Sequence, residues 1–192
     1  MRPLVVRASG RRQTGAVDDQ PRDPSPITSL ELLLDADAEA LVRAEWDALA
    51  QAGVSSMAPH TSPSNRPHVT LLARRGGLAQ PPELPPEAVP LPLVLGAPML
   101  FGDGDRRVLV RSVVPSAALL ALHSAVLEAA GAGDDVDHVA PGTWTPHVTL
   151  ARRLRLADLE RALPLIGGEI VATGVAIRRW DAATRTVTPI AP

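Results

Sequence analysis

The pentapeptide Pro-His-Val-Thr-Leu occurs twice in the sequence, at residues 67–71 and 146–150. Because side chains alternate between the two faces of a β-strand, each copy predicts a strand with one apolar face and one face that carries an imidazole and a hydroxyl. Two such strands brought together would surround a small anion with two proton-transfer groups and two hydrogen-bond donors. The candidate catalytic residues are His68, Thr70, His147 and Thr149.

A single His-Val-Thr strand has a plain structural explanation, because a half-exposed histidine beside a threonine is common on any sheet. Here the same five residues recur 79 positions apart, from Pro67 to Pro146. Strand propensity alone does not explain an identical repeat. We therefore interpret the repeat as functional.

The amino-acid composition excludes several kinds of active site. The chain of 192 residues contains no cysteine, which excludes disulfides, thiolate nucleophiles and cysteine-ligated metals. All 19 basic residues are arginines, so a Schiff-base lysine and a P-loop lysine are also excluded. The planar guanidinium group is then the fixed cation available to a phosphate. We expect neither a metal nor another cofactor.

The charge balance and the hydropathy pattern limit the partners. Nineteen basic and 21 acidic side chains give a net charge of −2, which does not suit a protein that coats extended duplex nucleic acid. A small anion or the end of a nucleic acid fits better. No apolar run approaches the roughly 20 residues that cross a bilayer, and the first residues lack the apolar region of a secretory signal. We expect a cytoplasmic monomer without a membrane partner.

The pattern along the chain predicts a tail followed by one domain. Residues 1–26 mix charged residues and proline without periodicity and are expected to form a flexible tail, which leaves residues 27–192 for the domain. The proline-rich segment 80–92 is expected to be a semi-rigid connector. The expected strands are 27–34, 67–73, 93–100, 107–113, a second motif strand that begins at Pro146, 169–180 and 185–190.

Three helices are expected between these strands, at residues 38–52, 117–130 and 157–163. For the first we predict Asp35 or Asp37 as N-cap, Gly53 at its end, and an inward stripe of Leu41, Leu49 and Ala52. The order strand, helix, polar loop and Pro-His-Val-Thr-Leu appears in both halves of the chain. This recurrence predicts an α+β fold of two lobes related by a pseudo-two-fold axis, with the motif strands near the axis.

The paired motifs resemble those of the two-histidine phosphoesterase superfamily, which carries two His-x-Thr/Ser-x motifs, x being apolar, in two related lobes. That superfamily includes the 2′-5′ RNA ligase-like proteins and the RNA 2′,3′-cyclic phosphodiesterases. The resemblance covers residues 27–190 and implies a bilobal fold, in which two pseudo-symmetric antiparallel sheets, each backed by helices, enclose a central groove. It also implies a nucleotide or an RNA-terminal cyclic phosphate as partner, with weak 2′-5′ ligation as the reverse reaction.

The chemistry of the motif residues suits hydrolysis of a cyclic phosphate. One group must deprotonate water, and a second must protonate the departing ribose oxygen. Two histidines supply both without a metal ion. The two threonines would donate hydrogen bonds to the non-bridging phosphate oxygens. The pseudo-symmetry leaves open which histidine is the acid and which is the base.

Three further residues are candidate substrate-binding residues. If the strands continue regularly, Arg74 and Arg153 share the face of the histidines; the alternative is that they are solvated strand ends. Trp144 lies three residues before the second motif histidine, where its indole is placed to stack on a base. The alternative for Trp144 is an apolar plug over the loop.

Two other functions remain open. The same groove can belong to a non-catalytic module that binds a phosphate or a nucleotide. Alternatively, the loop histidines that precede each motif can complete the site of a metal-dependent hydrolase. The four ligands would then be His60, His68, His138 and His147. His123 lies on a helix between apolar residues and is expected to be packed.

Overall fold

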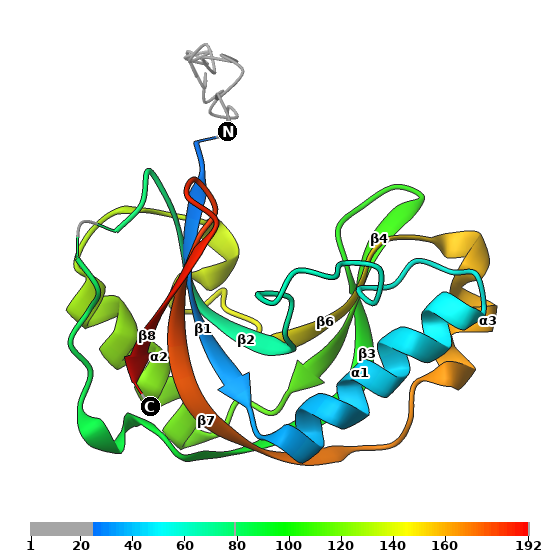
Figure 1. Cartoon of the computed structure of the whole chain (residues 1–192), viewed down its shortest axis with the longest axis horizontal. Helices are drawn as coiled ribbons and strands as arrows, with labels where there is room; N and C mark the ends of the chain where they lie inside the picture. The colour runs from blue at the N-terminus through cyan, green and yellow to red at the C-terminus, as the bar shows by residue number, and fades with distance from the viewer. Residues whose placement is uncertain (1–24, 79, 192) are drawn as a thin grey trace, which may run out of the picture.

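A computed structural model describes residues 25–78 and 80–191, which form an eight-stranded antiparallel sheet with three α-helices (Figure 1). The predicted α+β class is confirmed. The expectation of a flexible tail concerns residues 1–26, of which all but the last two lie outside the described residues. Within the described part of the chain, no helix has the length and apolar character needed to cross a membrane.

The strands follow the order β5-β2-β1-β7-β3-β4-β6 in the sheet, and β8 pairs with β7 beside this path. Their bounds are β1 (Ile27–Leu34), β2 (His68–Arg75), β3 (Leu91–Phe101), β4 (Arg106–Val113), β5 (Asp134–Asp135), β6 (His147–Arg155), β7 (Ile170–Asp181) and β8 (Thr186–Ala191). The helices are α1 (Ala36–Gln51), α2 (Ala117–Ala130) and α3 (Leu159–Ala162). The strand predicted at 27–34 and the helix predicted at 117–130 are confirmed. The two-residue strand β5 is not predicted, because it is too short to show a period.

The long strand β7 joins the two halves of the sheet. Its second half pairs with β1 and β8, and its first half pairs with β3. Gly174 lies at the crossover, where it faces Leu34 on one side and Leu91 on the other. A Cβ atom at this position would lie 2.8 Å from a methyl group of Leu32. Glycine therefore allows the strands to approach closely here.

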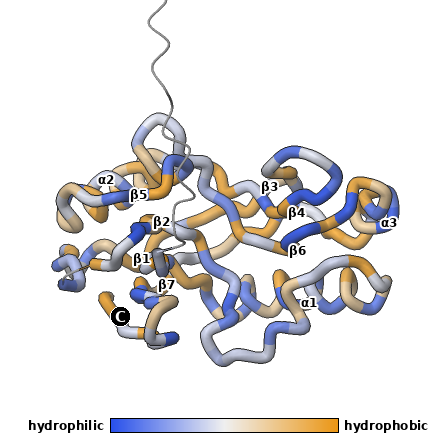
Figure 2. Tube along the Cα trace, turned by 90° about the horizontal axis from the view of Figure 1, so that it is seen from above, coloured by the Kyte–Doolittle hydropathy of each residue, from blue (hydrophilic) through white to orange (hydrophobic). Residues whose placement is uncertain are grey.

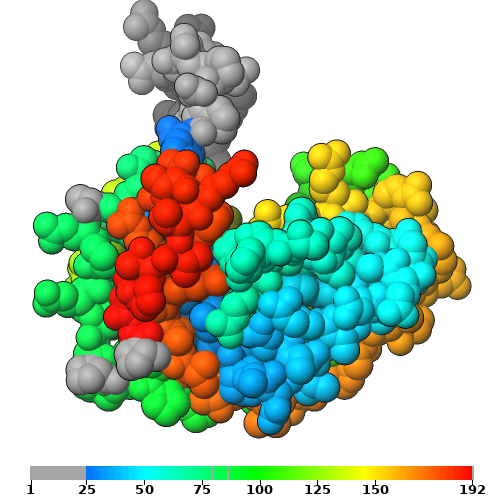
Figure 3. Space-filling view, viewed as in Figure 1, coloured from blue at the N-terminus to red at the C-terminus, as the bar shows by residue number. Residues whose placement is uncertain are grey.

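Strands β2 and β6 approach each other although four strands separate them in the sheet order. The sheet therefore curves strongly, and Figure 1 shows the two strands meeting in the middle of the molecule. Figure 3 shows a hollow between the β7–β8 hairpin, in red, and the green and yellow segments near residues 100 and 140. The curvature places the two Pro-His-Val-Thr-Leu segments beside one another.

Helix α1 packs on β6 and β7 and begins as predicted, with the Asp35 carboxylate accepting a hydrogen bond from Ala38 N at 3.0 Å. Helix α2 packs on β2 and β3, and its N-cap is Ser116. The helix predicted at 157–163 is instead a single α-helical turn between two 3₁₀ turns. Pro164 in the last of these turns has no N–H to continue an α-helix. Leucine and valine dominate the core between the helices and the sheet.

The buried face of α1 contains Trp46 and Leu49. The predicted stripe is therefore right at Leu49, but it is wrong at Leu41, which is 53% exposed. The inward face includes Glu45 instead, whose carboxylate forms a bidentate ion pair with Arg111 of β4. A charged residue on the inner face interrupts the apolar period on which the prediction depends.

Candidate active site

Both motif strands alternate as the sequence predicts. In β2, His68 and Thr70 are partly exposed, while the valine between them and the leucine after them are completely buried. The same holds in β6 for His147 and Thr149. Each strand therefore presents an imidazole and a hydroxyl on one face and packs its other face in the core.

Each motif strand also contains a β-bulge directly after its threonine. In β2 the pairing with β1 passes from Leu72 opposite Leu30 to Thr70 opposite Glu31, so Leu71 has no residue opposite it. In β6 the register shifts at the matching place. A bulge of this kind moves the following residues to the other face of the strand. The repeat thus extends from the sequence to the backbone geometry.

The two imidazoles are held in the same way. His68 Nδ1 donates a hydrogen bond to Arg66 O, and His147 Nδ1 donates one to Thr145 O, each at 2.7 Å. A carbonyl oxygen only accepts, so these bonds place the proton on Nδ1 in both neutral rings. The Nε2 atom of each ring is left to take up or release a proton.

Two tryptophans, one for each motif strand, tie these strands to the opposite half of the chain. Trp46 Nε1 donates to Thr149 O at 3.0 Å, and Trp144 Nε1 donates to Thr70 O at 3.0 Å. The main-chain oxygen of each candidate catalytic threonine is thus satisfied by an indole from the other half. Because the two bonds cross between the halves, they fix the motif strands relative to one another.

The loops after α1 and α2 add main-chain hydrogen bonds in the same crossed pattern. Met57 N donates to Leu150 O at 3.0 Å, and Val136 N donates to Ala73 O at 2.8 Å. Each loop therefore runs along the motif strand of the other half before it leads into its own motif. The crossed loops add to the fixation that the two indoles provide.

His147 lies against an apolar wall. The ring of Phe101 meets it edge-on, with the ring centroids 4.8 Å apart. The cavity beside His147 is lined by Phe101, Gly102, Val108, His138 and Thr145. Burial lowers the pKa of His147; the hydrogen bond to the Thr145 carbonyl opposes this effect, and the charges of His138 and His68 lower the pKa further.

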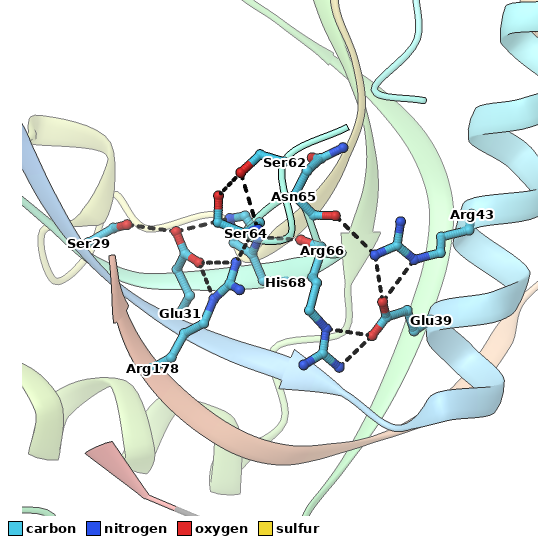
Figure 4. A network of polar contacts seen from close by, with 10 residues as sticks. All are labelled: Ser29, Glu31, Glu39, Arg43, Ser62, Ser64, Asn65, Arg66, His68 and Arg178. Carbon is cyan, nitrogen blue, oxygen red and sulfur yellow. Dashed lines mark hydrogen bonds and ion pairs between the residues drawn. The ribbon is translucent and has the colours of Figure 1, made fainter. Parts of the chain in front are cut away.

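His68 lies beside a buried carboxylate instead (Figure 4). Glu31 is only 4% exposed, and its Oε1 lies 3.6 Å from His68 Nε2. Ser29 Oγ donates to the same carboxylate oxygen at 2.7 Å, and Arg178 Nε donates to the other at 2.8 Å. Arg178 is buried as well and donates to Ser64 O at 2.6 Å. This network joins the loop before the first motif to β1 and β7.

The same loop is anchored to α1 by a second group of ion pairs. Arg66 and Arg43 both bind the carboxylate of Glu39 (Figure 4). Arg43 also donates to Asn65 O at 3.0 Å, and the Asn65 side-chain amide donates to two carbonyls within the loop. The carbonyl that orients His68 therefore belongs to a residue that is itself fixed.

The two halves differ at the position that faces each threonine. Glu31 faces Thr70 across β1 and β2, whereas Val110 faces Thr149 across β4 and β6. The first imidazole therefore lies beside a buried ion pair, whereas the second packs against the ring of Phe101. The two histidines are equivalent in sequence and inequivalent in environment.

The structure contradicts the expectation that Arg74, a candidate substrate-binding residue, shares the face of the histidines. The bulge after Thr70 places it on the opposite face. There its buried guanidinium pairs with Asp135 of β5 and donates to the carbonyls of Ala130 and Gly131 at the end of α2. Arg74 thus joins β2 to β5 and satisfies carbonyls at the helix end.

The prediction that Arg153 shares the face of the histidines also depends on a regular strand, and β6 is irregular. The register shifts a second time near Arg153, and its φ is 61°. The side chain is exposed and lines a surface hollow with other arginines, apart from the cavity beside His147.

Trp144 occupies the position of an apolar plug, the alternative to base stacking. Its indole stacks on His123 of α2, with ring centroids 3.8 Å apart and 6° between the planes. One face of the indole is thus covered, and its N–H is bound to Thr70 O. His123 is buried as predicted, and burial lowers its pKa against the opposing effect of its bond to the Val139 carbonyl.

The alternative metal site is not assembled. Within residues 25–78 and 80–191, no group of three or more histidine, cysteine or acidic side chains is arranged to hold a metal ion. His138 lies beside His147, whereas His60 is exposed on its loop. The arrangement therefore does not support a metal-dependent hydrolase built on these histidines and His68.

Three residues of the site are not predicted from the sequence: Glu31, Arg178 and Phe101. One signal is present, because Glu31 is the single charged residue in the strand sequence ITSLELLL, and a buried charge needs a partner. That partner, Arg178, lies 147 residues further along the chain. The fold is needed to bring the two together.

The chain matches a family model described as the 2′-5′ RNA ligase superfamily over residues 38–184, a stretch that contains both motif strands. The chain belongs to this superfamily. The resemblance inferred from the paired pentapeptides is thereby confirmed, and the protein is a 2′-5′ RNA ligase-like phosphoesterase.

Solved structures similar to this 2′-5′ RNA ligase-like protein include Usb1 of Kluyveromyces marxianus. The TM-score is 0.46 at 11% sequence identity, and the similarity covers 86% of this chain and 98% of that chain. No curated protein sequence matches the chain significantly.

Proposed function

We propose that this phosphoesterase hydrolyses 2′,3′-cyclic phosphates at RNA ends or on nucleotides, without a metal ion. One observation carries the proposal: each motif histidine is fixed through Nδ1 by a carbonyl two residues earlier, at 2.7 Å, which leaves both Nε2 atoms for proton transfer. Ring opening by acid–base catalysis needs two such groups on opposite sides of one phosphorus atom. The approach of β2 and β6 supports this arrangement.

The unequal surroundings of the two histidines support a division of roles. His147 acts as the general base, because its lowered pKa keeps the ring neutral at neutral pH and its Nε2 lone pair available. His68 acts as the general acid. The Glu31 carboxylate, 3.6 Å from Nε2, accompanies the positive charge of the imidazolium.

In the proposed step, water attacks phosphorus while His147 Nε2 removes a proton from it. The bond between phosphorus and one ribose oxygen breaks, and His68 Nε2–H transfers its proton to that oxygen. The product is a phosphomonoester beside a free hydroxyl; His147 has gained a proton from water, and His68 has given one to the ribose oxygen. Proton exchange with solvent restores the starting state. Attack by an RNA hydroxyl in place of water is the corresponding ligation.

Thr70 and Thr149 donate hydrogen bonds to the non-bridging oxygens in this proposal. Their main-chain oxygens are already bound by indoles, so the strands are fixed at the threonines before substrate arrives. Preorganised donors of this kind contribute on the order of a hundredfold or more to kcat.

A hydrolysis assay tests the proposal, with 2′,3′-cyclic nucleotides and a short RNA that ends in a cyclic phosphate, each with and without EDTA. We expect turnover that EDTA leaves unchanged, and a loss of at least about a hundredfold in kcat for His68→Gln and for His147→Gln. Turnover that stops in EDTA would favour a metal-dependent hydrolase. Binding of these compounds without any turnover would favour a binding module.

A further inference from the structure

We propose that four arginines of β4 and β6 form a second anion site, which holds the phosphodiester backbone of the RNA strand whose end is processed. This arginine cluster consists of Arg106, Arg152, Arg153 and Arg155, which line one surface hollow together with Gly53, Ser55 and Asp158. The inference rests on the proposed function, because that function supplies an RNA strand that leads away from the phosphate site.

The cluster carries more positive charge than its surroundings neutralise, and all four arginines are exposed. Among the residues that the structure describes, its ion pairing is limited to Arg155 with Asp158, and Asp158 is shared with Arg161. Asp105 acts on Arg155 from a longer distance. Five arginines against two carboxylates leave an excess of three positive charges, in a chain whose net charge is −2.

Two features of the cluster oppose stability. Arg106 lies directly opposite Arg155 in the β4–β6 register, and like charges in such a pair repel. Arg153 has a φ of 61°, a left-handed conformation in which glycine is the least strained residue. Binding of an anion explains why arginine occupies positions where stability alone favours other residues.

The cluster lies on the strand that carries the second motif. Arg152 follows His147 by five residues, which is on the order of 16 Å along a strand. Figure 2 shows β6 as hydrophilic toward α3. A single RNA strand whose last phosphate lies between the motif strands therefore reaches the cluster within a few nucleotides. A patch of this size suits a short single strand better than an extended duplex.

Guanidinium groups suit this ligand, because they bind phosphate oxygens in a bidentate manner and keep their charge at every physiological pH. The backbone that carries them is also fixed. Ser55 Oγ, on the loop after α1, donates a hydrogen bond to Arg152 O. The cluster therefore projects from a strand that is already held in place.

A pair of matched substitutions tests the site. Arg153→Gly removes one charge from the cluster at a residue with a left-handed backbone. Arg185→Gly is the control: it removes one charge at another left-handed residue, outside the cluster, in the turn between β7 and β8, where φ is 55°. The double variant Arg152→Ala/Arg153→Gly removes two charges from the cluster. The binding of a fluorescent RNA of about ten nucleotides with a terminal phosphate is followed by anisotropy over a range of salt concentrations.

We expect the double variant to bind this RNA at least about tenfold more weakly at low salt. The slope of log K against log salt should fall by roughly 1.4, because each single-strand phosphate contact contributes roughly 0.7. Arg185→Gly should leave the Kd and the slope unchanged. Both glycine variants should unfold at a higher urea concentration than the parent, which separates lost binding from lost stability.

An RNA affinity and salt slope that are unchanged in the double variant would overturn the second site. Equal competition by polyglutamate would also overturn it, because the cluster would then be an unselective anion surface. A cyclic mononucleotide is too short to reach the cluster, so we expect the parent and the double variant to hydrolyse it equally. A parent that binds RNA through the cluster and hydrolyses no cyclic phosphate would refute the proposed function alone.

Discussion

His68 Nε2 lies 3.6 Å from Oε1 of Glu31, a carboxylate that is buried between β1, β2 and β7. This separation is too long for a hydrogen bond, so Nε2 stays available. Arg178 neutralises the carboxylate from its other side. In the second half of the chain, Val110 occupies the corresponding position. The charged groups near the two histidines therefore differ.

Glu31→Gln is expected to lower kcat by at least about tenfold and the free energy of unfolding by about 3 kcal/mol. The substitution leaves the buried charge of Arg178 uncompensated beside His68, which disfavours the protonated form that the acid needs. Steady-state kinetics on a cyclic nucleotide and urea unfolding measure the two effects.

Glu45→Gln is the matched control, because Glu45 and Arg111 form a comparable buried ion pair. Arg111 faces Val148, on the face of β6 away from the motif histidine. We expect a similar loss of unfolding free energy with kcat unchanged in the folded enzyme. An equal fall of kcat in both variants would mean that Glu31 acts through stability alone.

The sequence predicts the local part of the site and not the part that depends on distant segments. Strand alternation places His68 and Thr70 on one face, and the structure confirms this because the pattern belongs to the strand itself. The face of Arg74 depends on the register between β1 and β2, where a bulge intervenes. Likewise, Glu31 acquires its role from Arg178, which a strand from the far end of the chain supplies.

In the fold, too, local features are predicted from the sequence, whereas features that depend on distant segments are not. Asp35 as a helix cap is predicted correctly, because a cap is a local hydrogen bond. The inward face of α1 is predicted only in part, since the burial of Glu45 depends on Arg111 in a distant strand. The two-residue strand β5 pairs with the end of β2, where Arg74 binds Asp135, and no local sequence pattern predicts it.

The pH dependence tests the role of His147. Burial lowers the pKa of this imidazole, so the acidic limb of kcat/KM should lie below the ordinary histidine value of about 6.5. His138→Asn removes a positive charge that lowers the pKa of His147, so its pKa should rise. Because a base loses activity as pH falls through its pKa, the limb should move to higher pH. An unmoved or lowered limb would argue against His147 as the base.

The crossed indoles predict coupling between the two motif strands. Trp46→Phe and Trp144→Phe each leave the main-chain oxygen of a candidate catalytic threonine without its donor, at a cost of roughly 1–3 kcal/mol. Because both bonds fix the same pair of strands, the double variant should differ from the sum of the single variants by more than about 0.5 kcal/mol. Urea unfolding of the three variants measures this coupling, and strict additivity would show that the strands are fixed independently.

Arg74→Ala distinguishes a structural arginine from a substrate-binding one. It leaves Asp135 and two carbonyls at the end of α2 without a partner, so the free energy of unfolding should fall by about 3 kcal/mol. The KM for a cyclic mononucleotide should not change. Arg75→Ala breaks only the exposed pair with Asp134 and should cost less than about 1 kcal/mol. A raised KM in Arg74→Ala would restore the substrate-binding role.

The central claim is that both motif imidazoles act on one phosphorus centre. A crystal structure of the protein with a bound mononucleotide phosphate tests it most directly. We predict that the Nε2 atoms of His68 and His147 each lie about 2.6–3.2 Å from different oxygens of the same phosphate, with the hydroxyls of Thr70 and Thr149 on its remaining oxygens. A phosphate that contacts one histidine while the other points elsewhere would contradict the claim.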